Sequence, residues 1–290
     1  MMIPVLLTRI KTRDGVMLDG IYAQPLRQSK TVLIWLHGLS SKFYSGHTLI
    51  GELSKRCARS GVGYFKFNTR GHDIITREPA MESGLGGTAF EKFEDCVLDI
   101  RAIIRLAKKL GYQNIILAGH STGANKALYY LYKTQDRGIQ GLLLLSPASD
   151  IDFDMKKFGK NEAMRRLTLA KELKTKKPFA LLPQGFGVWT AQRLVSLLSK
   201  GTPEDVFPYY NPRARWKELK SASIPIAVVF GSRDEHLTLP AKKLIEVFRV
   251  KAGSTKSFSG ITIKGADHGF VKKEKELART IIRWIKRAIV

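Results

Sequence analysis

The sequence predicts an α/β fold in which a mainly parallel sheet is covered by helices on both faces. Short apolar runs, typical of buried strands, alternate along the chain with stretches of helical periodicity. A hairpin pattern precedes this alternation, and polar segments rich in Gly, His and Asp follow several of the apolar runs. With 290 residues, 44% of them hydrophobic, the chain is long enough for one sizeable core.

The predicted strands begin with a hairpin around Asp14-Gly15, whose flanking segments alternate or carry β-forming residues. The following runs are more continuously apolar, as in 31–36 (TVLIWL), which is typical of strands buried on both faces. We expect strands at 6–11, 17–23, 31–36, 62–67, 115–118, 142–145, 225–230 and 260–264.

Helical stretches lie between these strands, and glycines mark the ends of two of them. Gly61 and Gly111 each follow such a stretch, in the position where a left-handed C-terminal cap favours glycine. We expect helices at 47–59, 90–110, 124–132, 161–174, 190–198, 239–250 and 272–289.

The periodicity changes between residues 149 and 216. Two helical stretches there flank a segment rich in Pro, Gly and aromatic residues, 178–189, and no run has the pattern of a strand. We expect such an insertion between two strands of an α/β sheet to be a helical lid. The chain is therefore divided into a core, 1–148 and 217–290, and a lid, 149–216.

The composition and motifs of the chain argue against several classes of protein, including membrane, secreted and metal-binding proteins. No apolar run is long enough to cross a bilayer and no secretory signal pattern occurs, so we expect a cytoplasmic protein without a transmembrane segment. Cys57 and Cys96 lie in helical patterns and are expected in the core. No metal-ligand spacing, phosphate-binding loop, dinucleotide motif or nucleic-acid-binding motif is present, so we expect no metal, no cofactor and no specific nucleic acid.

The segment 114–124 (NIILAGHSTGA) joins an apolar strand to a helix through the motif G-x-S-x-G. Strand, turn and helix in this order form a nucleophile elbow, which would expose Ser121 at the carboxyl end of the strand. Such a tight turn requires small residues at Gly119 and Gly123, with His120 supporting the site. The alternative is a Gly-Ser turn that only caps a helix, but the partners described next favour the catalytic interpretation.

A catalytic serine needs a base and an orienting acid. Asp234 follows one predicted strand and His268 follows the next, in the order Ser, Asp, His that this type of elbow predicts. We therefore expect His268 to accept the proton of Ser121 and Asp234 to orient the imidazole. The alternatives are Glu235 or Asp267 as the acid, His236 as the base and, more weakly, Asp150 or Asp152 as the acid.

The tetrahedral intermediate of acyl transfer needs hydrogen-bond donors for its oxyanion. The backbone amide of Thr122, directly after the serine, is one expected donor. The other is expected from the loop after the third strand, where His37 and Gly38 support the amide of Leu39, with Ser40 as the alternate.

Five motifs in order resemble the α/β-hydrolase superfamily over essentially the whole chain: HGLS at His37, RGHD at Arg70, GHSTG at Gly119, GSRD at Gly231 and GADHG at Gly265. The resemblance implies an α/β-hydrolase fold and the serine, acid and base roles given above.

Three longer runs resemble a poorly characterised branch of that superfamily that includes siderophore esterases: 90–100 (FEKFEDCVLDI), 119–127 (GHSTGANKA) and 144–150 (LLSPASD). This branch implies ester hydrolysis by a serine triad without a cofactor. We therefore expect a carboxylesterase-like serine hydrolase that cleaves a small or medium ester through an acyl-enzyme. The rivals are a peptidase or amidase with the same triad, and a non-catalytic polyanion-binding protein on the same scaffold.

The net charge of +24 is carried in part by the predicted lid. A basic face can be simply solvated, or it can draw anionic esters toward the site. The Lys and Arg residues concerned are Lys156, Lys157, Lys160, Arg165, Arg166, Lys171, Lys174, Lys176 and Lys177.

Overall fold

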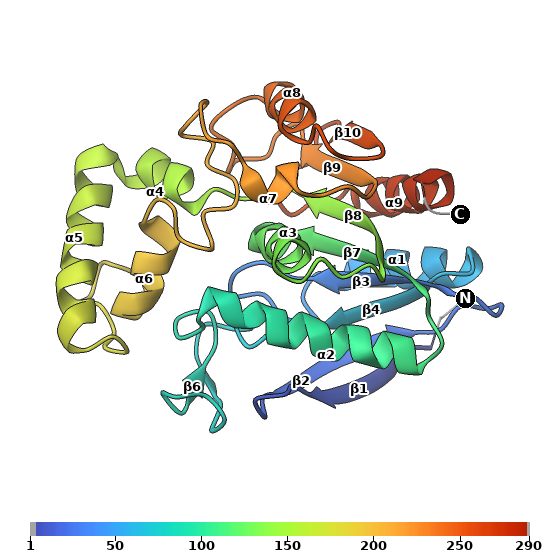
Figure 1. Cartoon of the computed structure of the whole chain (residues 1–290), viewed down its shortest axis with the longest axis horizontal. Helices are drawn as coiled ribbons and strands as arrows, with labels where there is room; N and C mark the ends of the chain where they lie inside the picture. Colours follow the sequence, from blue (N-terminus) through green and yellow to red (C-terminus); the bar gives the residue numbers. More distant parts are fainter. Residues whose placement is uncertain (1–3, 289–290) are drawn as a thin grey trace.

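The computed structural model describes residues 4–288 and places an eight-stranded sheet at the centre of the molecule (Figure 1). The strand order is β1-β2-β4-β3-β7-β8-β9-β10, and β2 runs antiparallel to both of its neighbours while the remaining pairs are parallel. The strands are β1 (Leu6–Lys11), β2 (Met17–Ala23), β3 (Thr31–Leu36), β4 (Gly63–Phe67), β7 (Asn114–His120), β8 (Ile139–Leu145), β9 (Ile226–Gly231) and β10 (Phe258–Ile263). A separate short ribbon pairs β5 (Thr76–Arg77) with β6 (Leu85–Gly86).

Helices cover both faces of the sheet because the central strands are buried on both sides and read as continuous apolar runs. One apolar cluster joins the sheet to α2, α3, α7 and α8, and a second joins it to α1 and α9. The helices are α1 (His47–Arg59), α2 (Cys96–Lys109), α3 (Thr122–Thr134), α4 (Asp150–Phe158), α5 (Lys160–Lys176), α6 (Ala191–Leu198), α7 (Lys217–Lys220), α8 (Ala241–Lys251) and α9 (Glu274–Ala288). The predicted α/β fold class is confirmed.

The structure differs from the predicted elements at α2 and α4. The helix expected from residue 90 begins only at Cys96, because 90–92 form a loop and Phe93–Asp95 form a 3-10 turn. The helix α4 was not predicted. Ser149 caps it by accepting a hydrogen bond from the amide of Asp152, and its first turns carry aspartates, which have poor intrinsic helix propensity. The last residue of the predicted closing helix, 289, lies outside the described residues.

Segment 149–216 follows β8 and lies to one side of the sheet, at the left of Figure 1, where α4, α5 and α6 gather. These helices enclose an apolar cluster of their own, which contains Ala170, Phe186 and Leu194. Leu39, from the loop after β3, packs against that cluster. The insertion therefore contacts the core at the loop where the sequence predicts an oxyanion donor.

Candidate active site

Ser121 occupies a strained turn between β7 and α3. Its backbone has φ 55° and ψ −130°, a region that non-glycine residues rarely adopt and that often marks a functional site. A Cβ on Gly119 would lie 2.1 Å from the carbonyl oxygen of Gly123, and one on Gly123 would lie 2.4 Å from that of Leu36. Both glycines are thus required by close backbone approach, as the elbow motif predicts.

His268 and Asp234 form a hydrogen-bonded pair at the carboxyl ends of β10 and β9. The imidazole Nδ1 lies 2.9 Å from Oδ1 of Asp234, and both side chains are largely buried. Burial alone would raise the pKa of Asp234, but the hydrogen bond and charge of His268 outweigh it and hold that pKa below its ordinary value. Because Nδ1 donates to the carboxylate, Nε2 is left as an acceptor, and it has no hydrogen-bond partner within residues 4–288.

The alternative acids and base occupy other positions around this pair. The Glu235 carboxylate accepts a hydrogen bond from the backbone amide of His268 at 3.0 Å, not from its ring. Asp267 accepts from the amide of Val271 at 2.8 Å, in an exposed turn. The ring of His236 stacks on that of His268 with 3.9 Å between centroids. The geometry therefore favours Asp234 as the partner of His268.

His120 and His37 support the site as neutral rings. The Nε2 of His120 lies 2.8 Å from the carbonyl oxygen of His268, which links the residue before Ser121 to the backbone of His268. The Nδ1 of His37 lies 2.9 Å from the carbonyl of Gly38, and its Nε2 accepts from the amide of Thr69 at 3.0 Å. Burial lowers the pKa of His120 to about 4 and that of His37 to about 3, so both are uncharged at neutral pH.

The loop after β3 approaches the serine very closely. A Cβ on Gly38 would lie 2.9 Å from Cβ of Ser121. Leu39 follows in the same loop, and Thr122 begins α3. In the described part of the chain, neither the Leu39 amide nor the Thr122 amide is engaged in a hydrogen bond. The Leu39 and Thr122 amides are thus two available hydrogen-bond donors next to Ser121.

Ser121 and His268 line one cavity of about 260 Å³. Its wall also includes Gly38 and Leu39 from the loop after β3, and Asp150 from the start of α4. Asp150 lines this cavity as a half-buried residue, and burial, followed by the charge of Glu204, raises its pKa to about 7. Asp152, the other weak acid candidate, accepts from the amide of Tyr210 at 3.0 Å and does not approach His268 through any described hydrogen bond.

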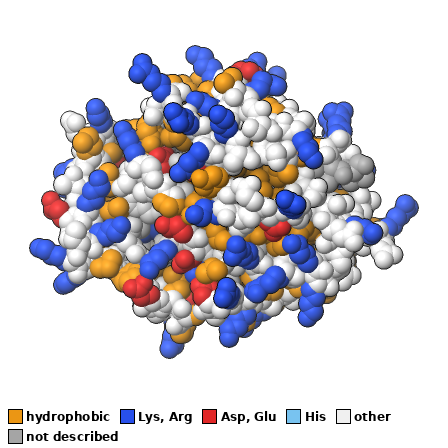
Figure 2. All heavy atoms as spheres, viewed as in Figure 1, with side chains coloured by type: hydrophobic (Ala, Val, Ile, Leu, Met, Phe, Trp, Pro, Cys, Tyr) orange, Lys and Arg blue, Asp and Glu red, His pale blue; other side chains and the backbone are white. Residues whose placement is uncertain are grey.

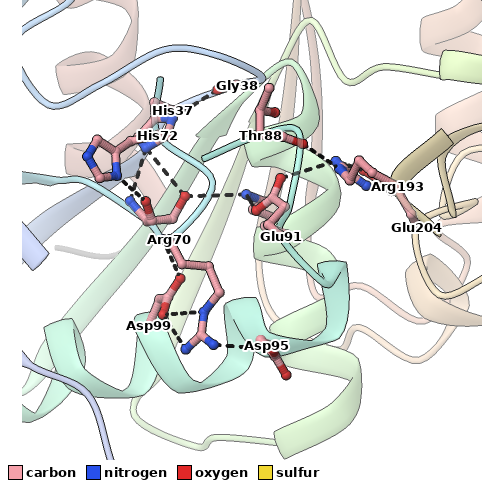
Figure 3. Close-up of polar contacts among 12 residues, drawn as sticks. His37, Gly38, Arg70, His72, Thr88, Glu91, Asp95, Asp99, Arg193 and Glu204 are labelled. Carbon is pink, nitrogen blue, oxygen red and sulfur yellow. Dashed lines mark hydrogen bonds and ion pairs between the residues drawn. The ribbon is translucent and has the colours of Figure 1, made fainter. Parts of the chain in front are cut away.

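A buried ionic network, which the sequence interpretation missed, joins the site to the insertion (Figure 3). Lys126 of α3 donates to Glu91 at 2.6 Å and to Thr69 Oγ1 at 3.3 Å. Arg193 of α6 donates to the other oxygen of Glu91 at 3.1 Å and to the carboxylate of Glu204. Burial opposes the charged form of Glu91, but the charges of Lys126 and Arg193 outweigh it and hold the pKa of Glu91 below its ordinary value.

The sequence did carry a signal for this network. Glu91 lies in the run 90–100 and Lys126 in the run 119–127, two of the three runs that resemble known hydrolases. A charged residue inside an otherwise apolar helix face, as Lys126 is in α3, indicates a buried ion pair because an unpaired buried charge is very costly.

A second cluster fixes the turn after β4. Arg70 donates to Asp99 from its backbone amide, Nε and Nη2 at 2.9 to 3.0 Å (Figure 3). Its Nη1 donates to Asp14 at 2.8 Å. The same turn presents the Thr69 amide to His37, so this cluster helps to hold the loop that bears Leu39.

Within residues 4–288, no three His, Cys, Asp or Glu side chains are grouped so as to hold a metal ion. Over the same range, no helix combines the length and the apolar character that a bilayer span requires.

Solved structures with the same fold include several esterases. The Pyrococcus furiosus esterase Pf2001 shares 18% identity, with 99% of this chain and 92% of that chain covered and a TM-score of 0.65. Est1E from Butyrivibrio proteoclasticus, solved with ferulic acid bound, shares 18% identity over 97% of this chain and 99% of that one, with a TM-score of 0.67. The siderophore hydrolase EstB from Aspergillus fumigatus shares 17% identity over 99% and 98% of the two chains, with a TM-score of 0.69. None of the curated proteins compared with the sequence matches it.

These likenesses show the α/β-hydrolase fold that the ordered motifs predict. The sequence profile of one family, described as "Protein of unknown function (DUF1749)", matches residues 76–289, which include Ser121, Asp234 and His268. The chain, with its strained serine turn and an α/β-hydrolase sheet, is therefore a member of the DUF1749 family.

Proposed function

We propose that the protein is a serine hydrolase that cleaves a small or medium carboxylic ester through an acyl-enzyme. The observation that carries the proposal is the shared cavity: Ser121 projects into it from a strained elbow, and His268, paired with Asp234, lines the same wall. A nucleophile, a base and an acid that orients the base form the constellation required for acyl transfer.

In the proposed mechanism, Nε2 of His268 accepts the proton of Ser121 as its oxygen attacks the ester carbonyl carbon. Asp234 fixes the tautomer and stabilises the imidazolium that forms. The oxyanion accepts hydrogen bonds from the amides of Leu39 and Thr122. His268 then protonates the leaving alcohol, and in the second half it activates water, which releases the acid and restores Ser121.

We assign residues 149–216 as a helical lid over a core formed by 1–148 and 217–290. The assignment is supported by α4, α5 and α6, which form their own apolar cluster and contact the core at Leu39. Asp150 and Phe153 of α4 line the cavity that contains Ser121. The lid would therefore contribute to the choice of substrate. The names esterase and siderophore hydrolase belong to the similar structures, not to this chain.

The rival functions are less well supported. A peptidase or amidase would use the same triad, but the similar structures reported above are esterases. Figure 2 shows Lys and Arg side chains scattered over the viewed face between apolar and neutral atoms, without the single basic stripe that polyanion binding favours.

A fluorophosphonate probe provides the direct test. We expect it to label Ser121 in the native protein, and labelling to vanish in Ser121→Ala while the fold is retained. Hydrolysis of a 4-nitrophenyl ester should be lost in the same variant. Labelling of another serine, or undiminished hydrolysis by Ser121→Ala, would refute the assignment.

A further inference from the structure

A second cavity of about 520 Å³ adjoins the cavity of Ser121. The two share three lining residues, Leu39, Asp150 and Phe153, so they lie side by side. The second cavity lies between the insertion and the core, because its lining includes residues of α4, α5 and α6 as well as Leu39 and Thr88. We call it the lid cavity.

Arg166 of α5 lines the lid cavity, and two of its guanidinium nitrogens have no hydrogen-bond partner among the described residues. The residue is only 4% exposed. Its Nη2 donates to the carbonyl of Phe186 at 3.2 Å, and its Nη1 lies 3.2 Å from Oδ1 of Asp154. Among the described residues, Nε and Nη1 have no partner in hydrogen-bonding geometry, and neither does Oδ2 of Asp154.

The other deeply buried arginine of the insertion provides a comparison. Arg193 donates from Nε to the carbonyl of Thr88, and its two terminal nitrogens donate to the carboxylates of Glu91 and Glu204. All three of its guanidinium nitrogens thus donate hydrogen bonds to other residues of the fold. Since burying an unsatisfied donor is costly, Nε and Nη1 of Arg166 are donors that a partner bound in the lid cavity could satisfy.

The surroundings of Arg166 specify what that partner is. The guanidinium lies 4.0 Å from the ring centroid of Phe158, and the rings of Phe186 and Trp189 line the same cavity. Aromatic walls favour an apolar or aromatic body, and a guanidinium fork binds a carboxylate through two parallel hydrogen bonds. Lys157 also lines the cavity and adds a second positive charge.

We propose that the lid cavity binds a carboxylate carried by the substrate at the end of an apolar or aromatic segment, with Arg166 as the residue that selects it. The preferred substrate is then an anionic ester, whose carboxylate reaches Arg166 while its ester group lies at Ser121. This inference rests on the proposed hydrolase function and assigns its substrate class. Burial raises the pKa of Asp150, which weakens one of the negative charges that would oppose such a ligand, whereas Asp154 is the carboxylate with which the ligand would compete.

The test uses esters that differ in one group. Mono-4-nitrophenyl adipate, pimelate and suberate each carry a carboxylate where 4-nitrophenyl hexanoate, heptanoate and octanoate carry a methyl group. For at least one length, we expect the native protein to favour the carboxylate ester in kcat/KM. Arg166→Gln should reduce that anionic-to-neutral ratio by about 10- to 100-fold, the range expected for hydrogen bonds to a charged group.

Two further variants keep the test decisive if Arg166→Gln is poorly folded. Asp154→Asn removes the carboxylate that competes for the fork, so the anionic-to-neutral ratio should increase, whereas a merely structural role would lower both rates together. Arg165→Gln is the matched control, because Arg165 is 61% exposed and pairs with Glu162. Its ratio should stay within about twofold of the native value, as for other exposed ion pairs.

Failure of this inference can be distinguished from failure of the hydrolase function. Hydrolysis of the neutral esters with unchanged ratios in Arg166→Gln and Asp154→Asn would overturn the inference alone. If neither ester is hydrolysed and Ser121 is not labelled, binding of 4-phenylbutanoate is compared with that of its amide by thermal shift. Stabilisation by the carboxylate alone, lost in Arg166→Gln, would support the lid cavity as an anion site; equal shifts would refute it.

Discussion

The guanidinium of Arg193 lies 3.1 Å from the carboxylate of Glu91, and both side chains are almost completely buried. Glu91 precedes α2 in the core, whereas Arg193 belongs to α6 of the insertion. The same carboxylate accepts a hydrogen bond from Lys126, which lies in α3 shortly after the strained turn at Ser121. A single acidic side chain thus pairs with cations from the insertion and from α3, the helix that begins directly after Ser121.

Glu91→Gln is expected to lower the free energy of unfolding by about 3–5 kcal/mol, because it leaves two buried cations short of a partner. The measurement is urea denaturation at neutral pH. Since the pKa of Glu91 is held below its ordinary value, its stabilisation is present above that ordinary value and is lost as pH falls through the folded-state pKa. The control Glu82→Gln removes an exposed partner of Lys92 and should cost no more than about 1 kcal/mol.

The side chain of Ser121 is expected to be needed for activity, whereas its strained backbone is expected to lower stability. Ser121→Ala and Ser121→Gly are both expected to lower kcat by about 10³-fold or more, since each removes the nucleophile. Glycine tolerates φ 55° whereas alanine does not, so Ser121→Gly should be about 1 kcal/mol more stable than Ser121→Ala. Equal melting temperatures for the two variants would contradict the strain at this position.

Gly38→Ala tests the approach of the loop after β3 to the serine. The added Cβ would meet Ser121 at 2.9 Å, so the loop must shift and displace the Leu39 amide. Loss of one oxyanion donor costs about 10²–10³ in kcat, and we expect a decrease of that size with little change in KM. Gly51→Ala in α1, where a Cβ meets nothing within 4 Å, should leave kcat unchanged and slightly increase stability.

Ionisation of Asp150 is expected to lower the free energy of unfolding as pH rises. Its carboxyl ionises near about 3.9 in an unfolded chain, whereas burial raises its pKa to about 7 in the folded protein. Between these two pH values Asp150 is protonated in the folded state but ionised in the unfolded state. The free energy of unfolding therefore falls as pH rises, and the full loss is present above about pH 7. Asp150→Asn removes that cost, so its melting temperature relative to the native protein should increase from pH 4 to pH 8.

The control for this prediction is Glu172→Gln, which removes an exposed carboxylate from α5 and should show no such trend. A difference between Asp150→Asn and the native protein that stays constant with pH would contradict the raised pKa.

Much of the fold followed from local patterns. The runs 31–36 and 6–11 and the helix 47–59 appear at the predicted bounds because strand and helix periodicity, together with glycine punctuation, are encoded locally. The elbow was predictable for the same reason, since its two glycines and serine are contiguous. The roles of Ser121, Asp234 and His268 remain predictions, although the structure brings the side chains of Asp234 and His268 into contact.

What the sequence could not provide depends on contacts between distant segments. Glu91, Lys126 and Arg193 are far apart along the chain, so even where the helix pattern indicates that Lys126 is buried, the sequence does not show which residues pair with it. The same holds for the basic residues of the insertion: Arg165 is exposed, whereas Arg166, its neighbour, is buried against Phe158. Neighbouring positions on a helix face different environments, so composition alone could not separate them.

The anchoring of α6 also determines which part of the insertion can open. Helix α6 is held to the core by Arg193 and by Thr190, whose hydroxyl donates to the carbonyl of Ala89 at 2.7 Å. Helix α5, in contrast, packs against α4 and α6 and donates from Arg166 to Phe186, all inside the insertion. Backbone amides of α6 should therefore exchange with solvent only when the core unfolds, whereas α5 forms a separate cooperative unit with a smaller opening free energy. Opening of α5 would then widen the lid cavity, whose wall includes Arg166, while α6 stays attached to the core.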